Sequence, residues 1–211
     1  MQQERAEYPA RLSVDYPDRD LNRLTTFFRL LVAIPILVVL STVAGGAWEW
    51  GYDKGREAAA AAGGPLFFGP LLMIVFRQKY PRWWFDFNLQ LTRFSTRVSS
   101  YLALMSDRYP STDEEQAVHV ELEYPNVKQD LNRWLPLVKW LLAIPHYVVL
   151  LFLTIASVVA VIVSWFAILF TGRYPRSLFD FVEGVMRWGL RVQAYATLLV
   201  TDRYPPFRLA A

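Results

Sequence analysis

Two short segments of alternating apolar and polar residues stand at similar places in the two halves of this chain. Residues 12–16 and 118–124 follow a two-residue period, which is typical of half-buried β-strands. Pro17 and Pro125 come directly after them, and a proline cannot donate a hydrogen bond to a sheet ladder. The pattern therefore predicts one short strand at the start of each half, and the two strands can pair with each other.

A long apolar run follows each predicted strand. The run at residues 24–44 contains only one charged residue, Arg29, and its length matches one crossing of a bilayer. The run at residues 134–170 has 37 residues, with Lys139 as its only charge. A straight helix of that length would measure about 55 Å, whereas the hydrocarbon core of a bilayer is about 30 Å thick. The second run must therefore bend, tilt or turn back.

An amphipathic helix is predicted after each apolar run. At about 100° per residue, its charged residues form one stripe and its apolar residues cover the other side. Each helix contains two arginines, and each would cost about 2.5 to 3.5 kcal/mol at mid-bilayer, so we expect both helices to lie in the membrane interface. The polar stripes are Asp86, Gln90, Arg93, Arg97 and Asp180, Arg187, Arg191, and the apolar faces are Phe87, Leu91, Phe94, Val98, Leu102, Met105 and Phe181, Val185, Trp188, Val192, Leu199.

These elements occur twice in the same order, together with the same short motifs. The repetition predicts two tandem repeats, residues 1–110 and 111–211, within one body, because neither copy alone is expected to cover its apolar surface. The repeated motifs are Tyr-Pro-Arg-x-x-Phe-Asp-Phe at 80–87 and 174–181, Asp-Arg-Tyr-Pro at 107–110 and 202–205, Asp-Leu-Asn-Arg at 20–23 and 130–133, and Ala-Ile-Pro at 33–35 and 143–145.

We expect each apolar run to form a transmembrane helical hairpin. The first repeat has an insert at residues 45–64, which aligns near residues 154–157 of the second, and insertions are tolerated where the backbone is exposed. Arginines and lysines flank the runs but are balanced by acids in the insert, so the positive-inside rule predicts cytoplasmic termini and an external insert. The alternative is one amphipathic helix and one tilted or kinked crossing per repeat. A single crossing per repeat would invert the copies and place their arginine-rich loops on opposite sides, which the rule disfavours.

Composition narrows the class of protein. The chain has 54% hydrophobic residues and a formal net charge of +3, but its arginines flank apolar runs instead of forming a polar basic face, so a nucleic-acid partner is not expected. The absence of cysteine excludes disulfides, thiolate metal sites and cysteine nucleophiles. No cleaved signal peptide is expected, because the polar segment before the first run is too long and cleavage would cut the first repeat in half.

The Tyr-Pro-Arg segments are typical of an aromatic belt at the headgroup level, with Trp83, Trp84 and Phe85 beside Arg82. The alternative is a set of contacts to anionic lipid headgroups. We expect Asp86 and Asp180 to cap their helices or to pair with the nearby arginines, and no base, nucleophile or metal ligand accompanies them. The candidate lipid contacts are Arg82, Arg93, Arg97, Arg176, Arg187 and Arg191.

Three basic residues lie inside the apolar runs. Arg29 and Lys139 are equivalent by the repeat, and the default expectation is that both snorkel to the surface. Alternatively, they line a central polar path. His146 follows Pro145, and an intramembrane histidine can relay protons, although neither run contains an acidic residue to support a pathway. His119, on a predicted strand, reads as a surface residue.

The second half resembles a bacterial membrane family known as domain of unknown function 4389. The resemblance implies a membrane fold and no particular activity. In the first half the pattern departs, with Ile36 at the histidine position, Phe94 at the tryptophan position, Asn88 and Gln90 in the glycine region, and the insert. The segments that resemble the family are Leu-Leu-Ala-Ile-Pro-His at 141–146, Phe-Thr-Gly-Arg-Tyr-Pro-Arg at 170–176, Leu-Phe-Asp-Phe at 178–181 with Gly184, Arg187 and Trp188, and Thr-Asp-Arg-Tyr-Pro-Pro-Phe at 201–207.

The sequence thus predicts a mainly α-helical, multi-pass protein of the bacterial inner membrane. We expect a non-enzymatic structural or accessory protein, without cofactor or metal, that presents a cytoplasmic interfacial platform to anionic lipid or to a protein partner and can self-associate. A small transport or channel component is the alternative, and it would require oligomerisation because two hairpins enclose little space.

Overall fold

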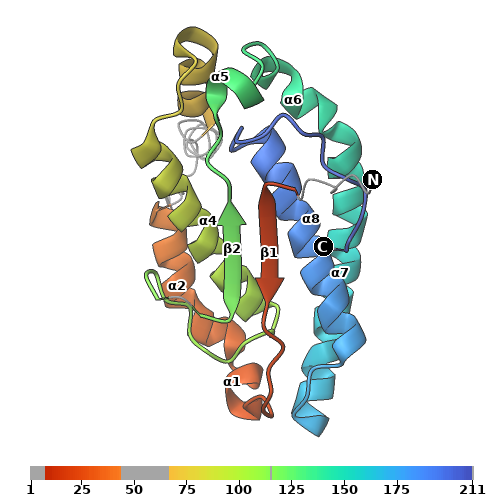
Figure 1. The fold of residues 1–211 in the computed structure, drawn as a ribbon. Coiled ribbons are helices and arrows are strands. Elements are labelled where there is room, and N and C mark those ends of the chain that lie inside the picture. The colour runs from red at the N-terminus through yellow and green to blue at the C-terminus, as the bar shows by residue number, and fades with distance from the viewer. Residues whose placement is uncertain (1–7, 44–66, 115, 211) are drawn as a thin grey trace, which may run out of the picture.

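The structure is a computed structural model that describes residues 8–43, 67–114 and 116–210 (Figure 1). It is mainly helical, with one antiparallel sheet of two strands. The insert at 45–64 lies outside the described residues. In chain order the elements are β1 Ala10–Val14, α1 Arg23–Phe27, α2 Arg29–Val43, an unlabelled helix Phe67–Arg77, α4 Arg82–Leu102, β2 Val118–Leu122, α5 Val127–Asp130, α6 Pro136–Leu142, α7 Ile144–Thr171 and α8 Arg176–Ala196.

The two predicted strands pair with each other, as their alternation allowed. β1 and β2 are antiparallel, with Leu12 opposite Val120, and together they form what we name the ribbon. On β1, Ala10, Leu12 and Val14 are buried while Arg11 and the residue at 13 are exposed. The alternation therefore gives the ribbon one face for the core and one charged outer face.

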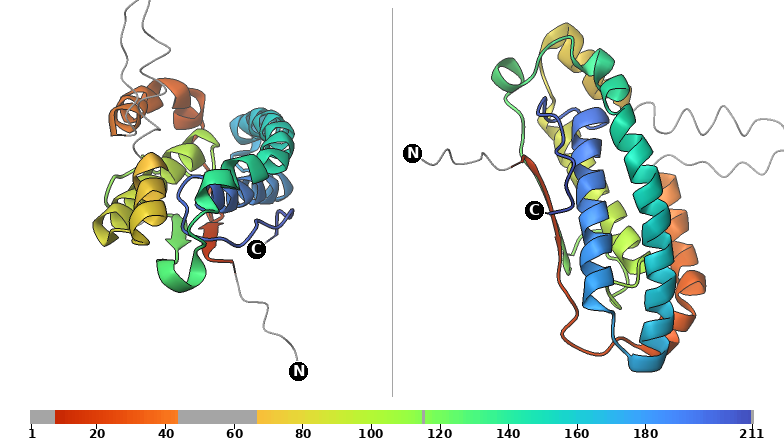
Figure 2. Two further views of the ribbon diagram at one scale, coloured as in Figure 1. Left: turned by 90° about the horizontal axis from the view of Figure 1, so that it is seen from above. Right: turned by 90° about the vertical axis from the view of Figure 1, so that its right-hand side faces the viewer.

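The molecule is built in three layers (Figure 2). The ribbon covers α4 and α8, the middle layer, which in turn packs against the outer helix layer of α2 and α7 with their short leading helices α1 and α6. The apolar faces of the amphipathic helices pack inward, with Phe94 and Val98 against Ala33 of α2, and Trp188 against Ala143 before α7. Helices of the outer layer therefore cover these apolar faces. That the two amphipathic helices lie in the membrane interface stays a prediction.

Each strand packs against the helix that belongs to the other half of the chain. β1 contacts α8 and β2 contacts α4. The arginines of the polar stripes also bond to the strand of the other half: Arg187 Nε donates to Leu12 O at 2.9 Å, and Arg93 Nε donates to Val120 O at 3.1 Å. The halves are therefore interlocked, because each amphipathic helix packs against the outer helices of its own half on one side and against the strand of the other half on the opposite side.

The two Tyr-Pro-Arg segments lie at opposite ends of the ribbon. Tyr16, just beyond the end of β1, donates a hydrogen bond to the carbonyl of Tyr174 at the start of α8. Tyr124, just beyond the end of β2, donates to the carbonyl of Tyr80 at the start of α4. Because the strands are antiparallel, these two helix starts are separated by the length of the ribbon (Figure 1).

The second apolar run contains no hairpin, so that expectation is wrong for this half. α7 is continuous through residues 154–157, where the turn was expected. The run has neither glycine nor proline between His146 and Thr171, and a turn there would leave backbone polar groups without partners. The one interruption is at Ala143, two residues before Pro145, which has no N–H for the preceding turn. The first run is likewise interrupted, at Phe28 between α1 and α2.

Among the described residues, α7 is the single helix long and apolar enough to cross a membrane by length and composition. Its 28 residues correspond to about 42 Å. Most of its side chains are exposed, which distinguishes it from the core helix of a water-soluble protein.

A proline placed at the expected turn tests the continuity of α7. Ala156 is exposed, so Ala156→Leu should leave the free energy of unfolding within about 0.5 kcal/mol of the wild type. Ala156→Pro should lower it by about 3 kcal/mol, because it removes a backbone hydrogen bond and clashes with the preceding turn. Urea unfolding in detergent, followed by circular dichroism, measures both. Equal stability of the two variants would show that the helix is broken there.

Candidate functional site

The cation of the first apolar run is buried and paired with a carboxylate. Arg29 is 2% exposed, and its Nη2 lies 2.6 Å from Asp107 Oδ1. Its Nη1 donates to the carbonyls of Ser106 and Tyr101, and its guanidinium lies 4.2 Å from the centre of the Tyr101 ring. Asp107 also accepts the backbone N–H of Asn22 at 2.6 Å, so it joins the start of α1 to the segment after α4.

Lys139 occupies the matching place in the second half. It is fully buried, with Nζ 2.6 Å from Asp202 Oδ1 and 2.7 Å from the carbonyl of Thr201. Burial lowers the pKa of the Lys139 ammonium, and Asp202 opposes this shift. Asp202 also accepts the backbone N–H of Asn132. The expectation that Arg29 and Lys139 snorkel to the surface is wrong, because both cations point inward to a carboxylate.

Aromatic rings and an arginine surround the two tyrosines that follow the strands, Tyr16 after β1 and Tyr124 after β2. Arg82 lies 4.7 Å above the ring of Tyr124, and Phe85 meets that ring edge-on at 5.1 Å. Around Tyr16, Arg176 and Phe179 take the matching positions at 4.6 and 5.0 Å. The Tyr-Pro-Arg motif therefore holds the strand end of the other half.

The remaining aromatic and acidic residues of the motif differ in exposure. Trp83 is 66% exposed, as an aromatic belt requires, whereas Phe85 is buried. Asp86 pairs with Arg82 and Asp180 with Arg176, at 3.8 and 3.0 Å, so the expected pairing is confirmed. The expected capping is wrong, because α4 and α8 begin four residues earlier and neither carboxylate lies in the first turn.

Four of the six candidate lipid-binding arginines donate to carbonyl oxygens of this chain. Arg93 and Arg187 contact the ribbon, as described above. Arg97 is buried and donates to Ser111 O, and Arg191 is buried and donates to Arg208 O and Ala210 O. Arg82 and Arg176 are exposed and face the solvent at opposite ends of the ribbon. Contact of these six residues with anionic lipid stays a prediction.

His146 is enclosed by aromatic side chains from α8 and the segment after it. It is fully buried, and its Nδ1 accepts a hydrogen bond from Trp188 Nε1 at 3.1 Å. The ring of Phe207 stacks on it at 4.0 Å, and that of Tyr204 lies 4.7 Å away. Its Nε2 has no hydrogen-bond partner in the structure. No carboxylate contacts the ring among these neighbours, and a proton-relay role stays a prediction. His119 is 39% exposed and lies 3.2 Å from Asp15 on the ribbon.

Within the described ranges, no three His, Asp or Glu side chains gather in a way that could hold a metal ion. Two cavities of about 620 and 340 Å³ open at opposite ends of the ribbon, one beside each Tyr-Pro-Arg segment. In the sequence, the Asp-Arg-Tyr-Pro motif was recognisable only as a repeat, and the pairing of its aspartates, Asp107 and Asp202, with the two cations was not predicted. The signal for this pairing was that each half has one cation in its apolar run and one such aspartate.

Removing one partner of a buried pair tests this assignment. Asp202→Asn should lower the free energy of unfolding by about 3 to 5 kcal/mol, because it leaves the Lys139 ammonium buried without a counter-charge. The double variant Lys139→Met/Asp202→Asn should recover a large part of that loss. The exposed Asp86→Asn serves as control and should cost at most about 1 kcal/mol. Urea unfolding in detergent measures all three, and equal losses at Asp202 and Asp86 would contradict the assignment.

Residues 134–208 match a family model described as a domain of unknown function (DUF4389). Neither the curated proteins nor the solved structures yielded a match. The matched segment contains Lys139, the His146 cluster and Asp202, and it begins after β2. A second copy in residues 1–110 stays a prediction. The chain therefore contains one DUF4389 domain, at residues 134–208.

Proposed function

We propose that this protein is a non-enzymatic structural component of a membrane surface. Its outer helix layer lies in one leaflet, parallel to the plane of the bacterial inner membrane, and its ribbon faces the cytoplasm as a platform for lipid headgroups or a protein partner. The observation that carries the proposal is the separation of exposed apolar and exposed charged side chains onto opposite faces of one three-layered body.

The outer helix layer is apolar on the side that faces away from the ribbon. Leu30 is 73% exposed on α2, and Phe152 is 66% exposed on α7. Burying such side chains in lipid is favourable by about 1.5 to 3 kcal/mol each, so a continuous layer of them favours stable seating in a bilayer. Other exposed apolar side chains of this layer are Leu24, Phe27, Leu31, Ile34, Val38, Leu137, Val138, Leu141, Ile155, Val159 and Phe166.

The opposite face, formed by the outer side of the ribbon, is charged. Arg11 lies 3.8 Å from Glu121 and 3.6 Å from Glu123, and all three side chains are largely exposed. Such pairs remain hydrated in water, and each charge would cost about 2.5 to 3.5 kcal/mol at the middle of a bilayer. This face therefore favours water.

An orientation in the membrane plane also reconciles the arrangement of the halves with the positive-inside rule. If α7 stood upright, the Tyr-Pro-Arg segments at the two ends of the ribbon would lie on opposite sides of the bilayer. With α7 lying flat, Arg82 and Arg176 are on the same side. A single helix layer is about 10 to 12 Å thick, which fits within the roughly 15 Å of hydrocarbon in one leaflet.

The length of α7 favours a second candidate, an oligomeric channel or transport component. A helix of 28 residues can cross a bilayer with tilt. In that arrangement the charged ribbon would have to line a water-filled path formed between several copies, because Arg11, Glu121 and Glu123 could not face lipid.

Single cysteines at Asp86 and Asp180 distinguish these two functions. The chain has no cysteine of its own, and both positions are exposed at opposite ends of the ribbon. In the proposed orientation, a membrane-impermeant maleimide should label both variants from the cytoplasmic side only, in inverted membrane vesicles. Labelling of one position from each side would refute the surface component and support the upright one.

A third variant, Phe152→Cys, is the control for burial in lipid. Phe152 is exposed on α7, so the impermeant reagent should fail to reach it while a lipid-soluble maleimide reacts. Rapid labelling by the impermeant reagent would place this layer in water and would contradict the membrane assignment itself.

A further inference from the structure

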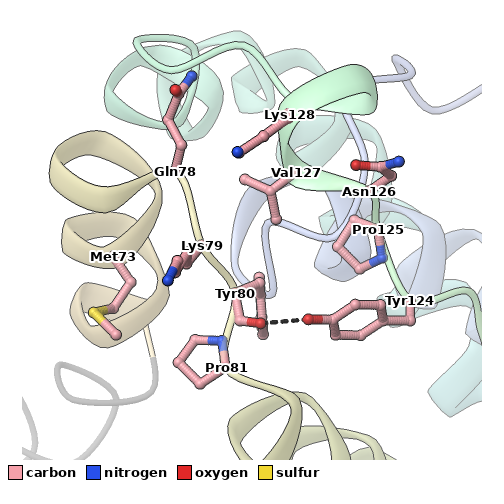
Figure 3. Close-up of a pocket in the computed structure, with 10 residues that line it drawn as sticks. All are labelled: Met73, Gln78, Lys79, Tyr80, Pro81, Tyr124, Pro125, Asn126, Val127 and Lys128. Atoms are coloured by element: carbon pink, nitrogen blue, oxygen red, sulfur yellow. Dashed lines mark hydrogen bonds between the residues drawn. The ribbon is translucent and has the colours of Figure 1, made fainter.

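The larger of the two cavities lies where β2 ends. It measures about 620 Å³ and is formed by the end of helix Phe67–Arg77, the linker to α4, and the segment between β2 and α5 (Figure 3). The hydrogen bond from Tyr124 to the carbonyl of Tyr80 joins two of these segments. Apolar lining comes from Met73, Val127 and two prolines.

The polar side chains of this cavity include two ammonium groups and two neutral amides. Lys79, Lys128, Gln78 and Asn126 line it, and no carboxylate is among the lining residues. In Figure 3 the Lys128 side chain extends from α5 toward the turn at Gln78, and Lys79 extends toward Met73. Both lysines are exposed, and within the described part of the chain neither forms an ion pair. Two ammonium groups beside amide donors are suited to a phosphate.

The smaller cavity, at the other end of the ribbon, provides an internal comparison. It is also lined by two cations, Arg19 and Arg173, but Asp18 and Asp20 line it as well. Arg173 Nε lies 2.9 Å from Asp20 Oδ1, so its charge is compensated within the chain. The two cavities occupy matching places in the two halves, but only the smaller one has acidic side chains that compensate its positive charges.

The residue at the turn beside each cavity also differs between the two halves. Gly172 has a φ of +77°, in the left-handed region that glycine adopts freely. The matching residue in the first half is Gln78, with a φ of +46°. A side chain bearing an amide thus stands at the rim of the basic cavity, at a backbone position where glycine usually ends a helix.

An apolar stripe leads to this rim. Phe68, Leu72 and Phe76 are exposed on helix Phe67–Arg77 and are spaced four residues apart, so they lie along one side of the helix. A ligand that has both a phosphate and hydrocarbon chains would satisfy the lysines and cover this stripe. We propose that the cavity binds the headgroup of an anionic phospholipid, with its acyl chains along helix Phe67–Arg77. This inference rests on the proposed membrane seating and adds a specific headgroup site to it.

The test measures binding of short-chain lipids to the full chain in detergent by native mass spectrometry. Dihexanoyl phosphatidylglycerol is the anionic probe and dihexanoyl phosphatidylcholine the zwitterionic one. The double variant Lys79→Gln/Lys128→Gln should weaken binding of the anionic lipid by about 30-fold, since each lysine near a lipid phosphate strengthens binding by roughly five-fold. Lys79→Arg/Lys128→Arg, which keeps both charges, should retain it.

The matched control is Arg19→Gln/Arg173→Gln, which removes two positive charges from the smaller cavity. This control should leave binding of the anionic lipid unchanged. An equal loss in both double variants would reduce the effect to general charge attraction and overturn the site. Inorganic phosphate is the second arm, and binding of phosphate as tight as that of the lipid would show a site for a soluble anion and overturn the lipid assignment.

Failure of this site and failure of the membrane seating are separable. The lysine double variant, combined with the single cysteines at 86 and 180, should keep the labelling pattern of the parent protein, because seating depends on the outer helix layer. Unchanged thermal unfolding of the double variant confirms that it is folded, as expected for two exposed side chains.

Discussion

The exchange of strands between the halves is the constraint on which the rest of the structure depends. β1 covers α8 and β2 covers α4, so one side of the amphipathic helix of each half is covered by the other half. The antiparallel register of the ribbon then determines that the halves are related by reversal along its length. The opposed Tyr-Pro-Arg segments and the paired cavities follow from that reversal, and the flat orientation that we propose is based on it. The DUF4389 segment, which begins after β2, cannot complete this packing without a strand from outside it.

Two buried ion pairs join the outer helix layer to the segments that follow the middle-layer helices. Arg29 and Lys139 extend from the outer helix layer to carboxylates in the segments that follow α4 and α8. A charge in an apolar interior needs a counter-charge and hydrogen bonds, and each cation here has a carboxylate within 2.6 Å and donates to at least one backbone carbonyl. These contacts turn the charged ends away from the exposed apolar face, so the layer proposed to meet lipid is free of them.

Patterns that depend on nearby residues predicted the elements, and contacts between distant residues explain what the patterns missed. The two-residue alternation around Leu12 and Val120 was sufficient for the strands and their pairing. The helical wheel identified the arginine stripe of α8, but it could not show that a strand, instead of water or lipid, covers Arg187. The partner of Lys139 is 63 residues away at Asp202, and no local period reports such a separation. The hairpin was wrong because the length of the run, the place of the insert and the distribution of charges suggested a turn that the residues of α7 do not provide.

The bond from Tyr8 to the carbonyls of Arg191 and Arg203 joins the two extremes of the described chain. During synthesis, β1 is made before its partner strand β2, and both strands are made before α8, the helix on which β1 packs. The open edge of β1 must be shielded until β2 is made, since unpaired strand edges promote aggregation. Packing of β1 on α8 is therefore a later step of folding than pairing of β1 with β2.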